Sequence, residues 1–226
     1  GHVHWQTNRP ADAVPAYEQA VALRERLLSQ ERLPHDRSEL ARTYGSLGQA
    51  LADLDRGDEA LARFRQALAL REELFARNPE VVEYRYDLAL SCKQVADELV
   101  ERGQFAEAFE LRKKTLAHFQ RLVEINPGNT AYRRALMVAH GDISWLYRRH
   151  KSQPARALQH LARQTEMGED LVQRKLAAPA HRLTLAEGYA QTGLLYLQQQ
   201  EYPRAIESFG QSNRVLEQLL AEQAED

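Results

Sequence analysis

Few side chains in this sequence are placed for catalysis or for metal binding. The eight histidines contain no pair at helical i, i+4 spacing, and the one close pair, His2 and His4, would supply only two ligands. Cys92 is the single cysteine, and no histidine is positioned to activate it as a nucleophile. Motifs such as a Gly-rich phosphate loop, His-Glu-x-x-His or Cys-x-x-Cys are absent. We therefore expect no catalytic residues, no metal site and no cofactor, and we do not expect an enzyme.

The composition favours a helical protein of a reducing compartment. The 226 residues include 32 Leu and 32 Ala but only 11 Val and 3 Ile, which disfavours sheet and favours helix. One cysteine excludes an internal disulfide framework. No apolar run approaches the ~20 residues of a membrane span, and no signal-peptide pattern opens the chain. These features predict an all-α cytoplasmic protein without a membrane partner.

Five segments of the chain repeat at a nearly constant interval. Each contains an alanine in a similar local sequence, and successive alanines are 47, 48, 49 and 48 residues apart: Ala13, Ala60, Ala108, Ala157 and Ala205. Prolines follow the first four alanines by 19 to 22 residues and indicate helix ends, because proline cannot continue a helix: Pro34, Pro79, Pro127 and Pro179. A second break precedes each later alanine. Each unit therefore has two helices, A and B, joined by a tight turn.

This pattern predicts the position of every helix. The expected A helices are 37–55, 81–101, 130–149 and 181–200, and the expected B helices are 10–30, 58–77, 105–125, 154–176 and 203–224. The chain then forms one domain, 1–226, with a half unit at 1–34 and units at 35–79, 80–127, 128–179 and 180–226. We expect the repeated alanine to let helix A approach helix B closely, since a larger side chain would separate them.

The units resemble the tetratricopeptide repeat family. The second unit has nearly the whole family pattern of large and small residues: Tyr44, Leu47, Gly48 and Leu51 on helix A, then Ala60, Phe64 and Ala67 on helix B. The fifth unit is close: Tyr189, Thr192, Gly193, Tyr196, Ala205, Phe209 and Ser212. The third departs from it at Cys92 and Arg112, and the fourth, with His140, is the weakest. Cys92 and His140 stand at equivalent helix-A packing positions, so we expect both in or beside the core.

The resemblance implies a right-handed α-solenoid of about nine helices, paired antiparallel, with a concave face lined by the A helices. The family's unit has 34 residues, whereas this one averages about 48, which is similar to the long-helix repeats of some bacterial multidomain signalling proteins. The first unit has almost no A helix. Because an uncapped repeat exposes its apolar face, we expect a fragment of a larger bacterial protein or a lost first helix. Gly1-His2 is consistent with a tag remnant.

The A helices supply the candidate binding residues. Those in register with the concave face, away from the A–B packing stripe, include Arg42, Gln49, Tyr86, Lys93, Asp97, Arg134, Trp145, Arg148 and Glu187. Glycine or alanine at one rung of three of these helices, Gly45, Gly141 and Ala190, leaves room for a ligand chain. Trp145, with Arg134 and Arg148, is the favoured anchor, because Trp and Arg dominate binding hot spots. Packing against a neighbouring A helix would explain Trp145 equally well.

The formal charge of −2 conceals an uneven distribution. Residues 112–163 contain eleven Lys and Arg but only Glu124 and Asp142 as acids, a local charge of +9. This basic stretch favours an acidic peptide or domain as partner. The alternative is solvated faces balanced by acids of adjacent units, such as Asp97, Glu98 and Glu101. The family's carboxylate clamp is matched only by Lys93, so we do not expect capture of a peptide carboxyl terminus.

These patterns predict a protein–protein interaction module that holds a peptide segment or partner domain in its concave groove. The alternative is a structural or regulatory spacer that docks on an attached catalytic domain or forms a homodimer through its terminal repeats. Candidates for the dimer contact in the last helix are Leu216, Leu219 and Leu220. Nucleic-acid binding is a weaker third hypothesis, because the pI is about 6.5 and no base-reading pattern repeats.

Overall fold

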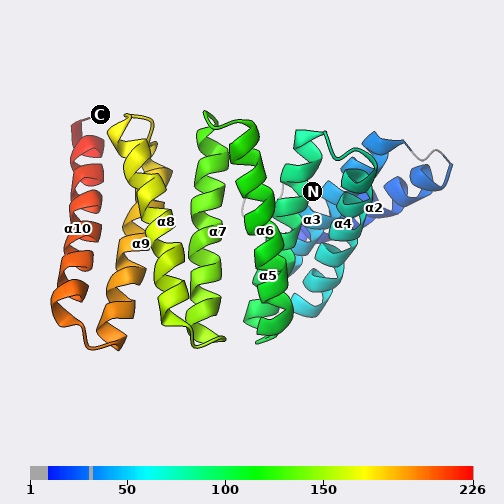
Figure 1. Cartoon of the computed structure of the whole chain (residues 1–226). Helices are drawn as coiled ribbons and strands as arrows, with labels where there is room; N and C mark the ends of the chain where they lie inside the picture. The colour runs from blue at the N-terminus through cyan, green and yellow to red at the C-terminus, as the bar shows by residue number, and fades with distance from the viewer. Residues whose placement is uncertain (1–9, 31–32, 226) are drawn as a thin grey trace. The chain divides into compact units, whose positions relative to one another are not determined.

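The computed structural model describes residues 10–30 and 33–225 of the chain. These residues form nine α-helices and no strand (Figure 1). The helices are α2 (Pro10–Gln30), α3 (Pro34–Ala52), α4 (Gly57–Arg77), α5 (Val82–Glu101), α6 (Phe105–Ile125), α7 (Thr130–Arg149), α8 (Pro154–Gln173), α9 (Pro179–Gln198) and α10 (Tyr202–Glu225). The predicted all-α fold of paired helices is confirmed. The expectations for Gly1, His2 and His4 concern positions outside the described residues.

The helix bounds differ from the predicted ones by at most three residues. The largest differences at helix starts arise at proline: Pro34 and Pro179 begin α3 and α9 instead of standing in the turn before them. The first residue of a helix needs no intrahelical N–H bond, and the fixed φ of proline suits that position. Pro79 and Pro127, by contrast, lie in turns, as predicted.

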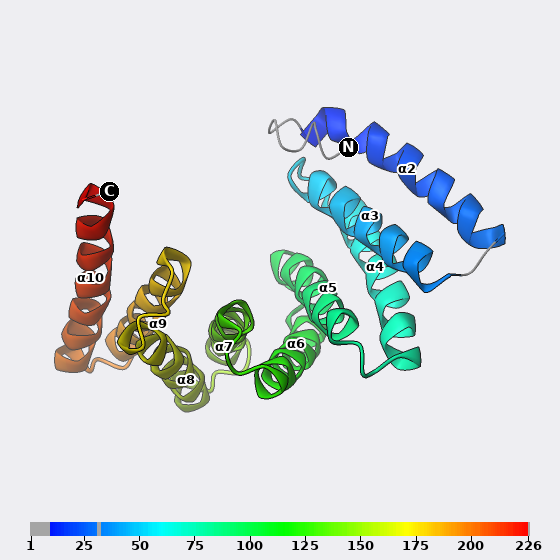
Figure 2. The same ribbon diagram turned by 90° about the horizontal axis from the view of Figure 1, so that it is seen from above.

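The chain divides into two compact units, residues 1–118 and 119–226, and the division falls inside α6. In the first unit α3 packs most extensively on α4, with α2 against α3 and α5 against α4 (Figure 2). In the second unit α7 packs on α8 and α9 packs on α10. Helix α8 also packs on α9, and this contact joins the two pairs. Each unit therefore has a core that runs along its helix pairs.

The repeated alanines are packing residues. Their exposed fractions are 0% for Ala13, Ala60, Ala108 and Ala157 and 2% for Ala205. A second contact recurs one turn further along helix B, where an aromatic ring lies against a glycine of helix A. A Cβ atom at Gly48 would meet the Phe64 ring at 2.7 Å, and one at Gly193 would meet the Phe209 ring at 2.8 Å. The small residues thus allow close approach of the paired helices, as predicted.

The turns between helices A and B repeat as well. Each contains one residue in the left-handed region, at spacings of 48, 49 and 48 residues: Asp55 (φ 57°), Gly103 (φ 69°), Ser152 (φ 49°) and Gln200 (φ 61°). Only Gly103 adopts this conformation without a steric cost from a Cβ atom. The other three turns keep the same path with side chains that tolerate it less well.

Cys92 is fully buried and His140 is half-buried, as predicted from their helix-A positions. The corresponding residues of two other repeats are tyrosines, and their hydroxyl groups donate hydrogen bonds to the preceding B helix. The Tyr44 hydroxyl donates to the Glu25 carboxylate, and the Tyr189 hydroxyl donates to that of Glu169. Burial, with the adjacent carboxylate, raises the pKa of both tyrosines.

Candidate partner-binding face

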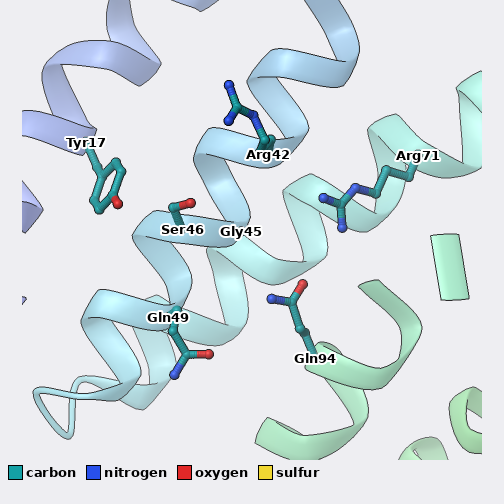
Figure 3. A pocket seen from close by; sticks show the side chains of 7 residues that line it. All are labelled: Tyr17, Arg42, Gly45, Ser46, Gln49, Arg71 and Gln94. Atoms are coloured by element: carbon teal, nitrogen blue, oxygen red, sulfur yellow. The ribbon is translucent and has the colours of Figure 1, made fainter. Parts of the chain in front are cut away.

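A pocket opens on α3 and α5 in the first unit. It is a cavity of about 270 Å³, which we call the α3–α5 pocket, and seven residues line it: Tyr17, Arg42, Gly45, Ser46, Gln49, Arg71 and Gln94 (Figure 3). Four of them follow one face of α3 at helical spacing, while α2, α4 and α5 contribute one residue each. Three of the lining residues, Arg42, Gly45 and Gln49, were predicted to face the groove.

Gly45 explains why there is a cavity at this place. A Cβ atom built there would meet nothing nearer than the Gln94 side chain, at 3.7 Å. Gly45 therefore differs from Gly48, three residues further along α3, because a glycine is needed at residue 48 for packing against Phe64. The absent side chain at residue 45 leaves a gap beside the Gln94 amide of α5, where Gly48 leaves none.

Arg71 lies at one wall of the pocket. Its side chain extends from α4 toward Gly45 and Gln94 (Figure 3). Nη1 donates to the Ser91 hydroxyl at 2.6 Å and to the Asp87 carbonyl oxygen at 3.2 Å. Among the described residues, no carboxylate lies within 4.0 Å of this guanidinium, the limit for an ion pair. Burial lowers the pKa of Arg71, so its charge is held in an environment that disfavours it.

Two acids lie near the pocket without lining it, Glu39 and Asp87. Glu39 pairs with Arg42 at 2.5 Å and with Arg24 at 3.1 Å, and the hydrogen bond from Arg42 lowers the pKa of Glu39. Asp87 offers Arg71 its carbonyl oxygen; burial raises the pKa of its carboxyl, against the opposing effect of the Arg71 charge. The pocket lining itself contains two arginines, uncharged polar groups and no acid.

The candidates on α5 lie outside the pocket. Lys93 Nζ is 2.7 Å from a carboxylate oxygen of Asp97, and the second oxygen of Asp97 accepts a hydrogen bond from the buried Arg112 on α6. Lys93 and Asp97 therefore stabilise the repeat. Tyr86 is half-buried on α5 and has interactions within the chain. Gln94, which the sequence interpretation did not select, is the α5 residue that lines the pocket.

The second unit carries the remaining candidates on α7 and α9. Arg134 is exposed and Arg148 is half-buried, and neither has an ion pair with a described residue. Trp145 is half-buried and interacts within the chain. Glu187 accepts a hydrogen bond of 3.0 Å from Gln191 on its own helix. Three leucines in register with Glu187 are exposed by 51%, 44% and 45%: Leu183, Leu194 and Leu197. This face offers arginines and apolar side chains, and neither of the two cavities described in the second unit, of about 500 and 240 Å³ and lined by α8, α9 and α10, includes Arg134, Trp145, Arg148 or Glu187.

Most of the basic stretch is neutralised internally. Six of its eleven cations form ion pairs: Arg112–Asp97, Lys113–Glu110, Lys114–Glu72, Arg121–Glu124, Arg133–Asp170 and Arg163–Glu166. Arg156 lies over the Tyr147 ring, 5.7 Å from its centre. For these residues the alternative interpretation, a balanced face, describes the contacts better than a free cationic surface does. Arg134, Arg148 and Arg149 on α7, like Arg156, have no ion pair with a described residue.

Tyr17, Ser46, Arg71 and Gln94 are pocket residues that the sequence interpretation missed. The prediction drew only on A helices, whereas Tyr17 and Arg71 come from the B helices α2 and α4. Arg71 reaches the pocket because its side chain is long enough to extend from α4 toward Gly45 and Gln94. The useful signal in the sequence is Gly45, which the repeat pattern does place on the concave rung of helix A.

Other reactive side chains do not form a site. The described residues contain no group of three or more metal-ligating side chains. His140 and His160 face each other with Nδ1 atoms 3.0 Å apart, and burial lowers the pKa of both. Burial raises the pKa of the Cys92 thiol to about 11, so the reactive thiolate is rare near neutral pH. No described helix is both long and apolar enough to span a membrane.

Comparison with known proteins agrees with this fold. A tetratricopeptide repeat family model matches residues 1–32 and 40–80. The apo form of RapI is similar with a TM-score of 0.64 and 19% identity, over 96% of this chain and 51% of RapI. MamA is similar with a TM-score of 0.59 and 12% identity, over 95% of this chain and 93% of MamA. No curated protein matches the sequence.

A third solved structure contains tetratricopeptide-like repeats by its own description. It is a putative kinesin light chain from Podosopora anserina, with a TM-score of 0.59 and 18% identity, over 99% of this chain and 92% of that one. The predicted resemblance to the tetratricopeptide repeats is confirmed. The present chain spans about half the length of RapI, and at these identities the similarity shows the fold alone. That fold is typical of non-catalytic scaffolds for protein interactions.

Proposed function

We propose that this chain is a bacterial cytoplasmic interaction module that binds an extended peptide segment of a partner protein along the A-helix face. The observation that carries the proposal is the α3–α5 pocket, which exists because residue 45 is glycine. Its lining combines Tyr17 and Arg71 with amide and hydroxyl groups, the mixture of a large ring, a guanidinium and hydrogen-bonding groups found at binding hot spots. In the second unit, Trp145 and Arg148 would add a further contact.

The experiment is a selection of short random-sequence peptides against the protein, followed by affinity measurements on purified peptides. Gly45→Leu is the informative variant, because its side chain should fill the pocket while its Cβ atom fits the helix. We expect affinity to fall at least about tenfold, equal to about 1.4 kcal/mol, without a fall in the melting temperature. Ala62→Leu adds the same side chain at an exposed position of α4 and is the matched control. Unchanged affinity in Gly45→Leu would remove the pocket from the proposal.

The second unit is tested separately. Trp145→Ala and Arg148→Glu should each weaken binding of selected peptides without unfolding the chain. If both variants bind as the wild-type protein does, peptide binding is confined to the first unit.

A second candidate function, docking or self-association through the first helix, is supported by one leucine position. Leucines recur at the same intervals as the alanines, and four of the five are buried, with exposed fractions of 3% for Leu74, 0% for Leu122 and Leu171, and 6% for Leu219. The first of the series, Leu27 on α2, is 57% exposed, and Leu23 one turn earlier is 61% exposed. Leu219 lies on α10, which packs on α9 and has no further described helix beyond it. Because Leu219 is buried all the same, the helix that covers this position is the paired A helix.

The same comparison limits the other end of the chain as a dimer contact. Of the three leucines suggested there, Leu219 is buried, whereas Leu220 is 65% exposed. Sedimentation analysis over a range of concentrations tests the second candidate. A dimer that Leu27→Glu dissociates and Leu194→Glu leaves intact would support α2 as the contact. A monomer at every concentration would exclude self-association. Docking of α2 on another domain would then be tested with the same two variants in a longer chain that includes the neighbouring domains.

A further inference from the structure

The α3–α5 pocket contains a guanidinium, that of Arg71, whose hydrogen-bond acceptors among the described residues are both uncharged and which has no carboxylate of a described residue within 4.0 Å. We infer that the pocket receives the carboxylate of an aspartate or glutamate side chain of the bound peptide, with Arg71 as the main group that holds it. This inference rests on the proposed function and adds the chemistry of one peptide position to it.

The hydrogen-bonding groups of Arg71 leave room for such a ligand. A guanidinium has five N–H donors in a planar fork. Among the described residues, only Nη1 has acceptors, the Ser91 hydroxyl and the Asp87 carbonyl oxygen. Both acceptors are uncharged. They fix the orientation of the guanidinium and leave its remaining donors for an anion.

The surroundings of Arg71 suit a carboxylate better than a cation or an apolar group. No acid lines the pocket; the acid that acts on Arg71, Asp87, stands outside the lining and offers Arg71 its carbonyl oxygen. Gln94 and Ser46 can donate further hydrogen bonds, and Arg42 stands on the rim with 55% of its side chain exposed. Burial of Arg71 also means that an ion pair here is less weakened by solvent than one on the surface.

Size and geometry agree with a single side chain. The cavity of about 270 Å³ has room for a glutamate side chain and the backbone that carries it. Access follows from Gly45, because a long side chain at that position would extend toward the Gln94 amide, on the side to which Arg71 also points (Figure 3). A planar guanidinium matches a carboxylate through two parallel hydrogen bonds, which a lysine ammonium cannot form.

The experiment uses two blocked tripeptides that differ in one group, acetyl-Ala-Glu-Ala-amide and acetyl-Ala-Gln-Ala-amide. Each is titrated into protein labelled with ¹⁵N at arginine and glycine, and the Arg71 Nε–H and Gly45 N–H resonances are followed. We expect saturable shifts with the glutamate peptide and an affinity at least about tenfold weaker for the glutamine peptide. Equal affinities for the two peptides would overturn the inference.

Variants of Arg71 locate the effect. Arg71→Met and Arg71→Lys should both abolish the difference between the two peptides at Gly45, the second because charge alone is not enough. Arg63→Met is the matched control on the same helix, since the Arg63 guanidinium bonds to Gln66 on the exposed side. Circular dichroism of each variant verifies that the helices form. A glutamate preference that persists in folded Arg71→Met protein would contradict the inference.

Two further arms separate this inference from others. The tripeptide acetyl-Ala-Ala-Ala with a free carboxyl terminus should bind at least about tenfold more weakly than the glutamate peptide; equal binding would overturn the assignment to a side chain. Peptides obtained by selection separate the two proposals. If Gly45→Leu weakens their binding, whereas Arg71→Met and Glu→Gln replacement in the peptide do not, the carboxylate inference is overturned and the proposed binding face is retained.

Discussion

Gly48 of α3 lies against the ring of Phe64 on α4, so closely that a Cβ atom at residue 48 would be 2.7 Å from two ring carbons. Three residues earlier on the same helix, a Cβ atom at Gly45 would meet only the Gln94 amide, at 3.7 Å and beyond. Two glycines of one helix therefore serve opposite purposes. Gly48 permits packing inside the repeat, and Gly45 leaves space outside it.

This contrast predicts opposite effects of the same substitution. Gly48→Ala should lower the free energy of unfolding by about 1–3 kcal/mol, because the ring of Phe64 must move. Gly45→Ala should raise it by about 0.5–1 kcal/mol, because alanine favours helix over glycine and meets no clash. Urea unfolding followed by circular dichroism measures both. Two changes of the same sign would show that α3 and α4 pack differently from this description.

The ion pair of Asp97 with Arg112 predicts a structural role for a residue that the sequence suggested as a ligand contact. Asp97→Ala removes an acceptor from an arginine side chain that is only 7% exposed, and should lower the free energy of unfolding by about 1–3 kcal/mol. Glu124→Ala, which breaks the exposed pair with Arg121, should cost at most about 0.5 kcal/mol. Chemical denaturation of both variants makes the comparison, and equal costs would contradict it.

The left-handed turn residues predict a stabilising substitution. Gln200→Gly replaces a side chain at φ 61° with the residue that the equivalent turn already has at Gly103. We expect the free energy of unfolding to rise by about 0.5–1 kcal/mol. Ala190→Gly, in the interior of α9, is the control and should cost about 1 kcal/mol. A loss of stability in Gln200→Gly would mean that the Gln200 side chain contributes more than its backbone strain costs.

The paired histidines of the second unit predict a decrease in stability on acidification. Burial, followed by the charge of neighbouring groups, lowers the pKa of His140 from 6.5 to about 4, and burial lowers that of His160. The unfolded chain therefore takes up protons first as the pH falls. The resulting stabilisation is complete above pH 6.5 and is lost toward pH 4, at up to about 1.4 kcal/mol per pH unit for each group.

His140→Tyr tests this pH dependence, since tyrosine stands at the equivalent position in two other units, as Tyr44 and Tyr189. Its unfolding free energy, measured in urea between pH 7 and pH 4, should fall less steeply than that of the wild-type protein. Identical slopes would exclude His140 as the source of the pH dependence.

The sequence alone predicted the helices to within three residues, because proline, glycine and the repeated alanine act locally. Its errors at helix starts came from Pro34 and Pro179, which can either end a turn or begin a helix. The candidate site was predicted less completely. Register on helix A identifies Arg42 and Gln49. The position of the Arg71 guanidinium, by contrast, depends on the rotamers of a long side chain and on its partners Asp87 and Ser91 in the next repeat. Neither follows from spacing along one helix.

The left-handed turn residues have a consequence for how such a chain changes in length. Asp55 and Gly103 stand 48 residues apart, as do Ser152 and Gln200, and each pair bounds one B helix, the next turn and the following A helix. An in-frame duplication or deletion between two such positions rejoins the backbone in the conformation it had before and restores an alanine to the same step of helix B. Gene rearrangement can therefore add or remove whole helix pairs without remaking the core.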